Sequence, residues 1–434
     1  MIEKIKIVFN SIIFFLKTPY FGFIYGHSYL TKQNLASIEL LIGSEDEKIV
    51  NKFEEKFQKV IGGSGECVAY AAARMGFYDL MRVLDIDHNS EIILTGSTCS
   101  VMANAVLKIG ASPIYSDIDP NTFGSSYDSI KNCITTKTKI IVAQHSFGIP
   151  CDIDNIKNLA KDKGIFLFED CALTLGSKVD GKSVGNFGDA ALFSTDHTKP
   201  INTFTGGVIY TRNSHLYKKL RHQRDSSKNI PVRKERAIFR RIKLESKICN
   251  PNFSGRIFLF NIIQIFKNKI LGFESPFLSL DSYSLPVDNI DYPYPSKMPS
   301  SLAQLGIYEI ERWNKSVINR RELFNSILNE LNNKNIRAYL PNAYYDSALY
   351  IVPLRFVWSD SDCYNYKSKI AEFIDIDSVW FLKPIVSTNE NIENYGYKIG
   401  SCPISEELGP WMFNLPCNVD PKYWGELIKK IKSL

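Results

Sequence analysis

The sequence predicts an α/β fold, with a large domain built on a mostly parallel β-sheet and a smaller C-terminal α+β domain. Two observations support this fold class. Short apolar segments alternate with helical segments through the first half of the chain, a pattern typical of parallel strands covered by helices on both faces. The chain also has 434 residues, 44% of them hydrophobic and 23% charged, which is long enough for one large and one smaller domain.

The alternating segments place the elements of the large domain. Strands are expected at Glu91–Gly96, Pro113–Ile118, Thr138–Gln144, Ile165–Asp170, Asp189–Ser194 and Gly206–Thr211. Helices are expected at Cys67–Leu84, Ser100–Ile109 and Ile153–Lys163. Ligands of such sheets bind beyond the carboxyl ends of the strands, where Asp170 and Ser194 fall.

The C-terminal part has a different rhythm. Apolar residues at a spacing of three to four predict a long helix at Asn314–Leu331. Strands are expected at Ala348–Val357 and Ser378–Phe381, and a closing helix at Tyr423–Ile431. We therefore divide the chain into an N-terminal arm at 1–40, a large domain at 41–290 and a small domain at 291–434.

Cysteine and histidine usage argues against metal and disulfide chemistry. The nine cysteines are scattered and odd in number, and they include no C-x-x-C pair. This pattern predicts free thiols in a reducing cytoplasm. The six histidines form no H-E-x-x-H motif and do not cluster with the cysteines, so no metal site is expected.

Two segments raise the question of a membrane. Ile5–Leu16 is apolar, but Lys17 and Pro19 interrupt it well short of the roughly 20 residues that a membrane-spanning helix needs. The segment Ile5–Leu16 is therefore expected to form a helix that either packs on the protein or lies on a membrane surface. Further on, residues 212–247 hold thirteen Lys/Arg against three Asp/Glu, a local charge of +10, and the apolar stretch Phe253–Phe273 follows.

Three interpretations of residues 212–273 stay open at this point. The segment is a solvated basic surface beside a core helix, a site for a nucleotide diphosphate, or a peripheral contact with an anionic membrane. Nucleic acid is not expected as a partner, because no recognition motif accompanies the charge.

Lys199 and Asp170 are the strongest candidates for catalysis. Asp170 ends a buried apolar strand, and Lys199 follows 29 residues later in a polar turn flanked by glycine. Taken alone, such a lysine is usually solvated and such an aspartate usually caps a helix. Together they suit pyridoxal 5′-phosphate, because the amine forms a Schiff base with the cofactor aldehyde and the carboxylate keeps the pyridine nitrogen protonated.

The flanking motifs resemble those of a known family. EDCALTLGSKVDGKSVGNFGDAALFS leads to the Lys199 turn, and GGVIYT follows it. These blocks resemble the DegT/DnrJ/EryC1/StrS sugar aminotransferases, which are fold-type I pyridoxal phosphate enzymes that aminate keto sugars on nucleotide carriers. Further matching blocks are Thr95–Phe123, Ala143–Ile156, Ser300–Phe324 and Cys402–Asp420. By the same resemblance, part of residues 213–290 is an insertion.

The resemblance implies a role for each site residue. Asp170 is the partner of the pyridinium nitrogen, and Lys199 carries the cofactor. Ala73 and Arg74 lie at the start of a helix whose N–H groups hold the cofactor phosphate. Ser194 hydrogen-bonds the same phosphate.

Three positions depart from the family pattern. Cys99 stands where many relatives stack an aromatic ring on the cofactor. Leu173 replaces a His or Gln that is expected to hydrogen-bond the phenolic oxygen, and Asp196 stands where His is common, with His197 after it. These changes indicate a divergent branch, but the lysine and the aspartate are retained.

The presence of Lys199 bears on the type of reaction. In related sugar 3-dehydratases a histidine takes this place, so the lysine favours transamination, with an amino acid, usually L-glutamate, as donor and a nucleotide-linked keto sugar as acceptor. A pyridoxal phosphate sugar dehydratase and a non-catalytic relative that binds cofactor or sugar remain as alternatives. The resemblance also implies a homodimer, although Pro295, in YPSKMP, stands where relatives have an Asn that reaches the partner's phosphate.

Overall fold

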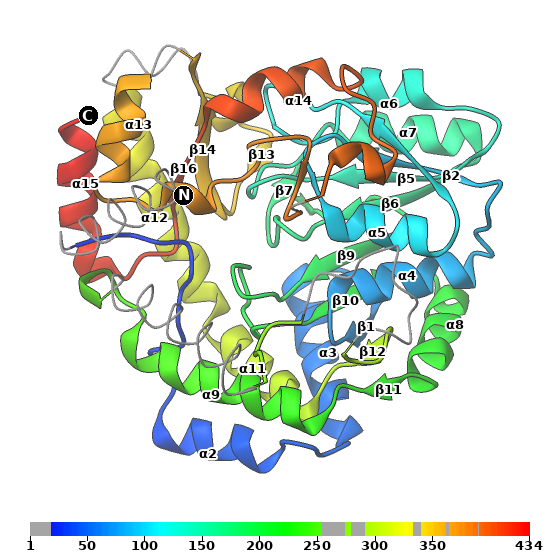
Figure 1. Cartoon of the computed structure of the whole chain (residues 1–434), viewed down its shortest axis with the longest axis horizontal. Helices are drawn as coiled ribbons and strands as arrows, with labels where there is room; N and C mark the ends of the chain where they lie inside the picture. Colours follow the sequence, from blue (N-terminus) through cyan, green and yellow to red (C-terminus); the bar gives the residue numbers. More distant parts are fainter. Residues whose placement is uncertain (1–18, 254–273, 279–290, 333–339, 362–363, 389) are drawn as a thin grey trace.

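The computed structural model describes residues 19–253, 274–278, 291–332, 340–361, 364–388 and 390–434 (Figure 1). The predicted helix at Ile5–Leu16 lies outside these residues, as does almost all of the apolar stretch Phe253–Phe273. Within the described ranges, no helix is both long enough and apolar enough to cross a bilayer.

The large domain is organised by a nine-stranded sheet in the order β11-β12-β1-β10-β9-β6-β5-β2-β4. Strands β9, β6, β5, β2 and β4 run parallel to one another, while β10 is antiparallel to both β9 and β1. The bounds are β1 Glu66–Tyr70, β2 Glu91–Thr95, β4 Ser112–Ser116, β5 Thr138–Gln144, β6 Phe166–Asp170, β9 Ala190–Ser194, β10 Gly207–Thr211, β11 Lys228–Asn229 and β12 Ser296–Lys297. The mostly parallel sheet confirms the predicted fold class.

The register of the central strands creates the edge on which the site is built. Gln144 at the end of β5 pairs with Asp170 at the end of β6, and Asp170 is in turn opposite Leu192 of β9. The interiors of these strands are almost fully buried, which explains their continuous apolar sequence. Because parallel strands end at the same edge, the residues that follow β5, β6 and β9 come together.

Helices of the large domain pack on this sheet (Figure 1). Helix α4 contacts β1, β9 and β10, and it also contacts α5 and α8. Helix α7 contacts β5 and β6. The bounds are α2 Lys32–Leu40, α3 Glu47–Ile61, α4 Ala73–Val83, α5 Ser100–Lys108, α6 Tyr127–Cys133, α7 Ile153–Lys163, α8 Ser214–Asp225, α9 Val232–Ile248 and α11 Ser300–Glu311.

The C-terminal part forms a second apolar cluster, at the left of Figure 1. Its strands β14 and β16 pair antiparallel, and α12 packs against α15. Phe21 of the N-terminal segment belongs to the same cluster. The bounds are α12 Trp313–Asn332, β13 Leu349–Tyr350, β14 Arg355–Ser359, α13 Tyr364–Ala371, β15 Ile385–Val386, α14 Pro403–Leu408, β16 Met412–Pro416 and α15 Trp424–Lys432. The remaining short elements are β3 Thr98–Cys99, β7 Lys178–Val179, β8 Lys182–Ser183 and six 3₁₀ turns at Pro251–Phe253, Asn342–Tyr345, Ile376–Ser378, Ile392–Tyr395, Gly409–Trp411 and Pro421–Tyr423.

Three predicted elements are wrong in part. The helix expected at Cys67–Leu84 is strand β1 followed by α4, because the apolar run Cys67–Tyr70 pairs with both β10 and β12. The strand expected at Ala348–Val357 is divided into β13 and β14, and Pro353, which has no N–H to donate, lies in the gap. Ser378–Phe381 is a 3₁₀ end and turn rather than a strand. The domain boundaries at residues 40 and 290 stay predictions.

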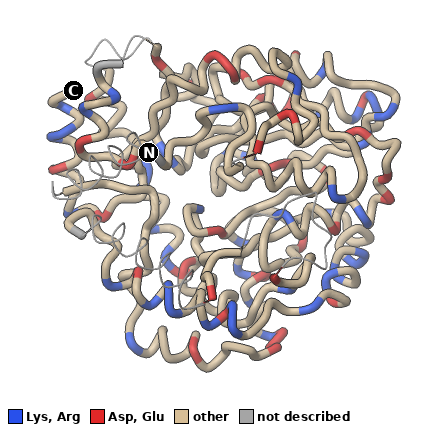
Figure 2. Tube along the Cα trace, viewed as in Figure 1, with Lys and Arg blue, Asp and Glu red and all other residues tan. Residues whose placement is uncertain are grey.

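Helix α9 separates the charges of the basic segment into two sets. Arg241 and Glu245 face inward and are buried, forming an ion pair with each other. The exposed cations repeat every three or four residues and form one stripe, composed of Arg233, Arg236, Arg240, Lys243 and Lys247. Figure 2 shows the blue segments along this helix. Helix α9 therefore has an exposed basic face, and its opposite face is buried in the core.

Candidate active site

A cavity of about 220 Å³ lies at the carboxyl edge of the sheet. All seven residues predicted to contact the cofactor line it, namely Ala73, Arg74, Cys99, Asp170, Leu173, Ser194 and Lys199. They come from segments up to 126 positions apart, so the sheet is what brings them together. Their individual roles stay predictions.

Asp170 presents a buried carboxylate to this cavity. It ends β6, and its side chain is 5% exposed. Its Oδ1 accepts a hydrogen bond of 2.9 Å from the Ala172 N–H, and among the described residues no cation lies within 4.0 Å ion-pair distance of it. Burial raises the pKa of the Asp170 carboxyl, although the Ala172 hydrogen bond and the charges of Lys199 and His145 oppose the shift. A cationic ligand group would stabilise the ionised form.

Lys199 lies in the turn after β9, and its position is set by the backbone. Its N–H donates to the Asp196 carbonyl at 3.0 Å, and its Nζ lies 4.3 Å from the centroid of the Trp380 ring. Burial lowers the pKa of the Lys199 ammonium below its usual range, against the opposing charges of Asp196, Cys99 and Asp170. A lowered pKa increases the fraction of neutral amine, which is the nucleophilic form.

His197, two residues earlier, faces the other way. Its Nε2 lies 2.8 Å from Glu245 Oε2 on α9, and its ring packs against Phe204. It does not line the cavity that holds Asp170. The structure therefore gives this histidine a partner in α9 and leaves Lys199 as the basic side chain of the turn that faces the cavity.

The N-terminus of α4 opens on the same cavity. Its N-cap residue is Ala72, which makes no side-chain capping bond, so the first N–H groups have no partner from that side chain. A Cβ on Gly207 would lie 2.4 Å from the Ala73 Cα, so only glycine lets β10 approach the helix this closely. Arg74 donates to the Tyr292 hydroxyl at 3.1 Å. These groups provide a pre-formed place for an anion.

Sequence reasoning missed several residues of the cavity. Trp380, Phe381, Val386 and Ser387 line it from the C-terminal part, where no motif pointed to them. Gln144 also lines it, and its amide donates to the Ser97 carbonyl at 2.7 Å. The position of Gln144 at the end of a predicted parallel strand was a signal that could have found it.

Behind Asp170 lies a buried group that has the composition of a metal site, composed of His145, Glu169 and Cys171. The Glu169 carboxylate accepts hydrogen bonds of 2.6–2.7 Å from the N–H groups of residues 185, 187 and 188. It also contacts His145 Nε2 at 3.2 Å, while His145 Nδ1 accepts from the Cys151 N–H at 3.1 Å. In these hydrogen bonds, Glu169 and His145 use the atoms that would otherwise bind a metal ion. The bonds connect the ends of β5 and β6 to the segment 185–188.

Comparisons with known proteins show which family this chain resembles. The model of the DegT/DnrJ/EryC1/StrS aminotransferase family matches residues 40–248. GDP-perosamine synthase of Escherichia coli O157:H7 is 37% identical over 177 residues, covering 40% of this chain and 47% of the synthase. The chain thus spans about half the length of the curated relatives that it matches.

Solved structures show the fold over nearly the whole chain. DesI, solved in the presence of its TDP-sugar product, superposes with a TM-score of 0.70 at 18% identity, covering 98% of this chain and 96% of DesI. The PLP form of a putative sugar aminotransferase, Spr1654 of Streptococcus pneumoniae, gives a TM-score of 0.69 at 16% identity, covering 96% and 97%. Residues 40–248 thus match the DegT/DnrJ/EryC1/StrS aminotransferase family, and the fold of the solved structures extends over nearly the whole chain.

Proposed function

We propose that this protein transfers an amino group from an amino acid, L-glutamate, to a keto sugar carried on a nucleotide, with pyridoxal 5′-phosphate as cofactor. The observation that carries the proposal is that Lys199 and Asp170 face one cavity at the carboxyl edge of the sheet. The names of GDP-perosamine synthase and of DesI with its TDP-sugar product support a nucleotide-linked sugar as acceptor. We place the reaction in the synthesis of surface polysaccharides or of secondary-metabolite sugars.

The residues present fit this cofactor. Asp170 is a buried carboxylate without a cationic partner at ion-pair distance among the described residues, which suits a protonated ring nitrogen. The N-terminus of α4, which lacks a side-chain cap from Ala72, suits the phosphate together with Arg74 and Ser194. The cofactor supplies an electron sink for the substrate carbon from which a proton is removed.

The protein groups would then have distinct tasks. Lys199, whose pKa is lowered by burial, would bind the cofactor and then act as the base that moves a proton at the substrate carbon. Asp170 holds the positive charge of the ring. Leu173 and Cys99 wall the cavity without the hydrogen bond and the ring stacking that family resemblance implies at these positions.

An absorption experiment and an assay test the proposal together. The purified protein with added cofactor is expected to show a visible band that L-glutamate bleaches, and a panel of nucleotide keto sugars is expected to restore it. Restoration of the band by one sugar identifies the acceptor. If a deoxygenated sugar appears without transfer of nitrogen, the dehydratase alternative is correct. Failure to take up cofactor at all supports a non-catalytic relative.

The oligomeric state is a further part of the proposal. We propose a two-fold homodimer in which the partner completes the cavity, as family resemblance implies. The local sequence is unusual, because Pro295 has no N–H to offer a partner. Light scattering is expected to give twice the monomer mass, and full activity in a monomer would contradict the idea.

The exposed stripe of α9 supports a peripheral contact with an anionic membrane. All five exposed cations lie on one face. Tyr20 and Pro251, which are close in sequence to the apolar stretches Ile5–Leu16 and Phe253–Phe273, are joined by a hydrogen bond of 3.1 Å. We expect co-sedimentation with anionic vesicles at low salt and release as salt rises, with equal binding to neutral vesicles as the contrary result.

The eight described cysteines are free thiols, which supports a place in the cytoplasm.

A further inference from the structure

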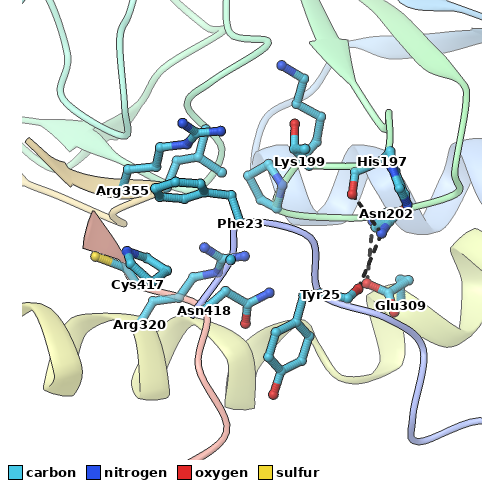
Figure 3. A pocket seen from close by; sticks show the side chains of 15 residues that line it. Phe23, Tyr25, His197, Lys199, Asn202, Glu309, Arg320, Arg355, Cys417 and Asn418 are labelled. Atoms are coloured by element: carbon cyan, nitrogen blue, oxygen red, sulfur yellow. Dashed lines mark hydrogen bonds between the residues drawn. The ribbon is translucent and has the colours of Figure 1, made fainter. Parts of the chain in front are cut away.

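A second, smaller cavity lies on the other side of the Lys199 turn (Figure 3). Five segments that are far apart in the sequence line it, at residues 22–25, 197–202, 309–320, 354–355 and 416–418. In Figure 3 the Lys199 side chain extends away from Tyr25 and Arg320. The turn, including Lys199, lines both cavities.

Two buried arginines face this second cavity. Arg320 on α12 is 1% exposed, and its Nη1 donates to the Pro353 carbonyl at 3.2 Å. Arg355 on β14 is 2% exposed, and its Nη1 donates to Asn414 Oδ1 at 2.9 Å. Among the residues that the structure describes, no acidic side chain lies within 4.0 Å ion-pair distance of either guanidinium.

Aromatic rings hold Arg355 in place. Its guanidinium carbon lies 3.9 Å from the centroid of the Phe23 ring and 4.4 Å from that of Trp380. Phe23 belongs to the N-terminal segment, which is tied to the turn where the Asn202 amide donates to the Tyr25 carbonyl at 3.4 Å. The guanidinium plane is thus fixed before any ligand arrives, which reduces the ordering cost of binding.

Burial outweighs the acidic charges near these two groups. It lowers the pKa of Arg355 to about 9, against the charge of Asp375, and that of Arg320 to about 10, with Glu309 among the opposing charges. Glu309 is the acidic residue of the lining, and its Oε2 accepts a long bond of 3.4 Å from the Asn202 N–H rather than pairing with an arginine. A buried charge without a partner at ion-pair distance is destabilising, so a ligand that supplies a negative charge would bind favourably here.

The size of the cavity restricts that ligand. Its volume is about 30 Å³, which is room for roughly two water-sized atoms. A carboxylate has two oxygens in one plane, and a guanidinium offers its donors in the matching fork. A sulfate or phosphate has four oxygens in a tetrahedron and needs more room.

We propose that Arg320 and Arg355 form a binding subsite for a carboxylate group beside the Lys199 turn. The carboxylate comes from one of two sources. It belongs to the amino donor, an assignment that rests on the proposed function, or it is a free small carboxylate that ties the N-terminal segment to the C-terminal part.

Thermal unfolding of the cofactor-free full-length chain tests the subsite without any catalysis. We expect sodium formate to raise Tm in a saturable way, by about 2–3 °C when formate is at 100 times its Kd. Sodium sulfate at matched ionic strength is expected to give only the gradual, non-saturating rise of an excluded salt. If formate shows no saturable effect, the proposal is wrong, whatever the fate of the aminotransferase assignment.

Two variants separate a ligand site from a structural arginine. Arg320→Met removes the charge but retains much of the volume, so we expect it to be at least as stable as the wild type in formate-free buffer and to lose the formate response. Lys315→Met, at an exposed position of the same helix, is expected to keep it. Arg355→Lys retains a charge without the fork and is expected to weaken the response at least tenfold in Kd. Equal formate responses in the wild type, Arg320→Met and Arg355→Lys would overturn the proposal.

Competition identifies the source of the carboxylate. If the subsite holds the amino donor, formate is expected to raise the KM for glutamate with kcat unchanged, and Arg355→Lys to raise it at least tenfold. If the subsite holds a free anion, formate raises Tm equally with and without saturating glutamate. Both outcomes support a carboxylate subsite and differ only in its occupant.

Discussion

The two cavities that meet at the Lys199 turn bury opposite combinations of charge. The first holds the carboxylate of Asp170 together with the lowered-pKa amine of Lys199. The second holds two guanidinium groups, Arg320 and Arg355, that have no acidic side chain at ion-pair distance among the described residues. One cavity therefore suits a ligand with a cationic ring, and the other suits a small anion.

Their origins in the sequence differ as much as their charges. The first cavity is lined mainly by residues 72–199, which follow successive strands of one sheet. The second is assembled from five distant segments. A turn that separates two such environments allows one side to react while the other side only binds, and substitutions on each side are expected to have separable effects.

Loss of the Lys199 amine is expected to have the largest effect. In Lys199→Ala no other amine replaces it at this position of the cavity, so amino transfer is expected to fall below detection and the visible band of lysine-bound cofactor to disappear. The formate response of Tm is expected to stay, because the Lys199 side chain extends away from Arg320. Lys163→Ala, at the exposed end of α7, is the control. Steady-state transamination by Lys199→Ala would overturn the assignment of this residue.

The second largest effect is expected from Asp170→Asn. The amide preserves the shape of the side chain and its acceptor oxygen but removes the charge that stabilises a protonated ring. The loss of a buried charged partner costs about 3–4 kcal/mol, which is roughly 10²–10³-fold in rate. We expect the visible band to persist while kcat falls. A rate within threefold of the wild type would show that another group carries this role.

The fold of the large domain and the residues of the first cavity that bind the cofactor in the proposal could be predicted from the sequence. Strands β5 and β6 are buried on both faces, so their residues read as continuous apolar runs, and the polar residues after them fall at one edge. Strand β1 was missed because Cys67–Tyr70 runs without a break into the alanines that lead to α4. A short apolar run does not show by itself whether it forms a strand or a helix.

The second cavity, with Arg320 and Arg355, could not have been predicted from the sequence. Arg320 sits on a long helix and Arg355 on a short strand, and nothing in their sequence neighbourhoods distinguishes them from exposed arginines. They become functional candidates only because tertiary packing buries them and, among the described residues, leaves no acidic side chain at ion-pair distance. Trp380 is similar, since a turn that was predicted as a strand delivers it to both groups.

A shift in pH dependence is expected from Asp196→Asn. The Asp196 charge favours the charged form of Lys199, opposing the effect of burial, so its removal is expected to lower the pKa of the amine further. The neutral amine is then available at lower pH. We expect the rate at which the visible band develops, after cofactor is added to cofactor-free protein, to show an acid limb shifted to lower pH. Asp154→Asn, exposed on α7, should leave the limb in place, and a shift to higher pH would contradict the argument.

The smallest effect is expected at Trp380, which lines the first cavity and contacts Arg355 of the second. The Trp380 ring lies 4.3 Å from Lys199 Nζ and 4.4 Å from the guanidinium carbon of Arg355. A benzene ring offers each cation less surface, and cation–π contacts of this kind contribute about 0.5–1 kcal/mol. Trp380→Phe is therefore expected to reduce both the rate of amino transfer and the affinity for formate by roughly two- to fivefold. If only one of these quantities changes, the ring acts on that cation alone, and the two sides of the turn are more independent than their contacts with one ring suggest.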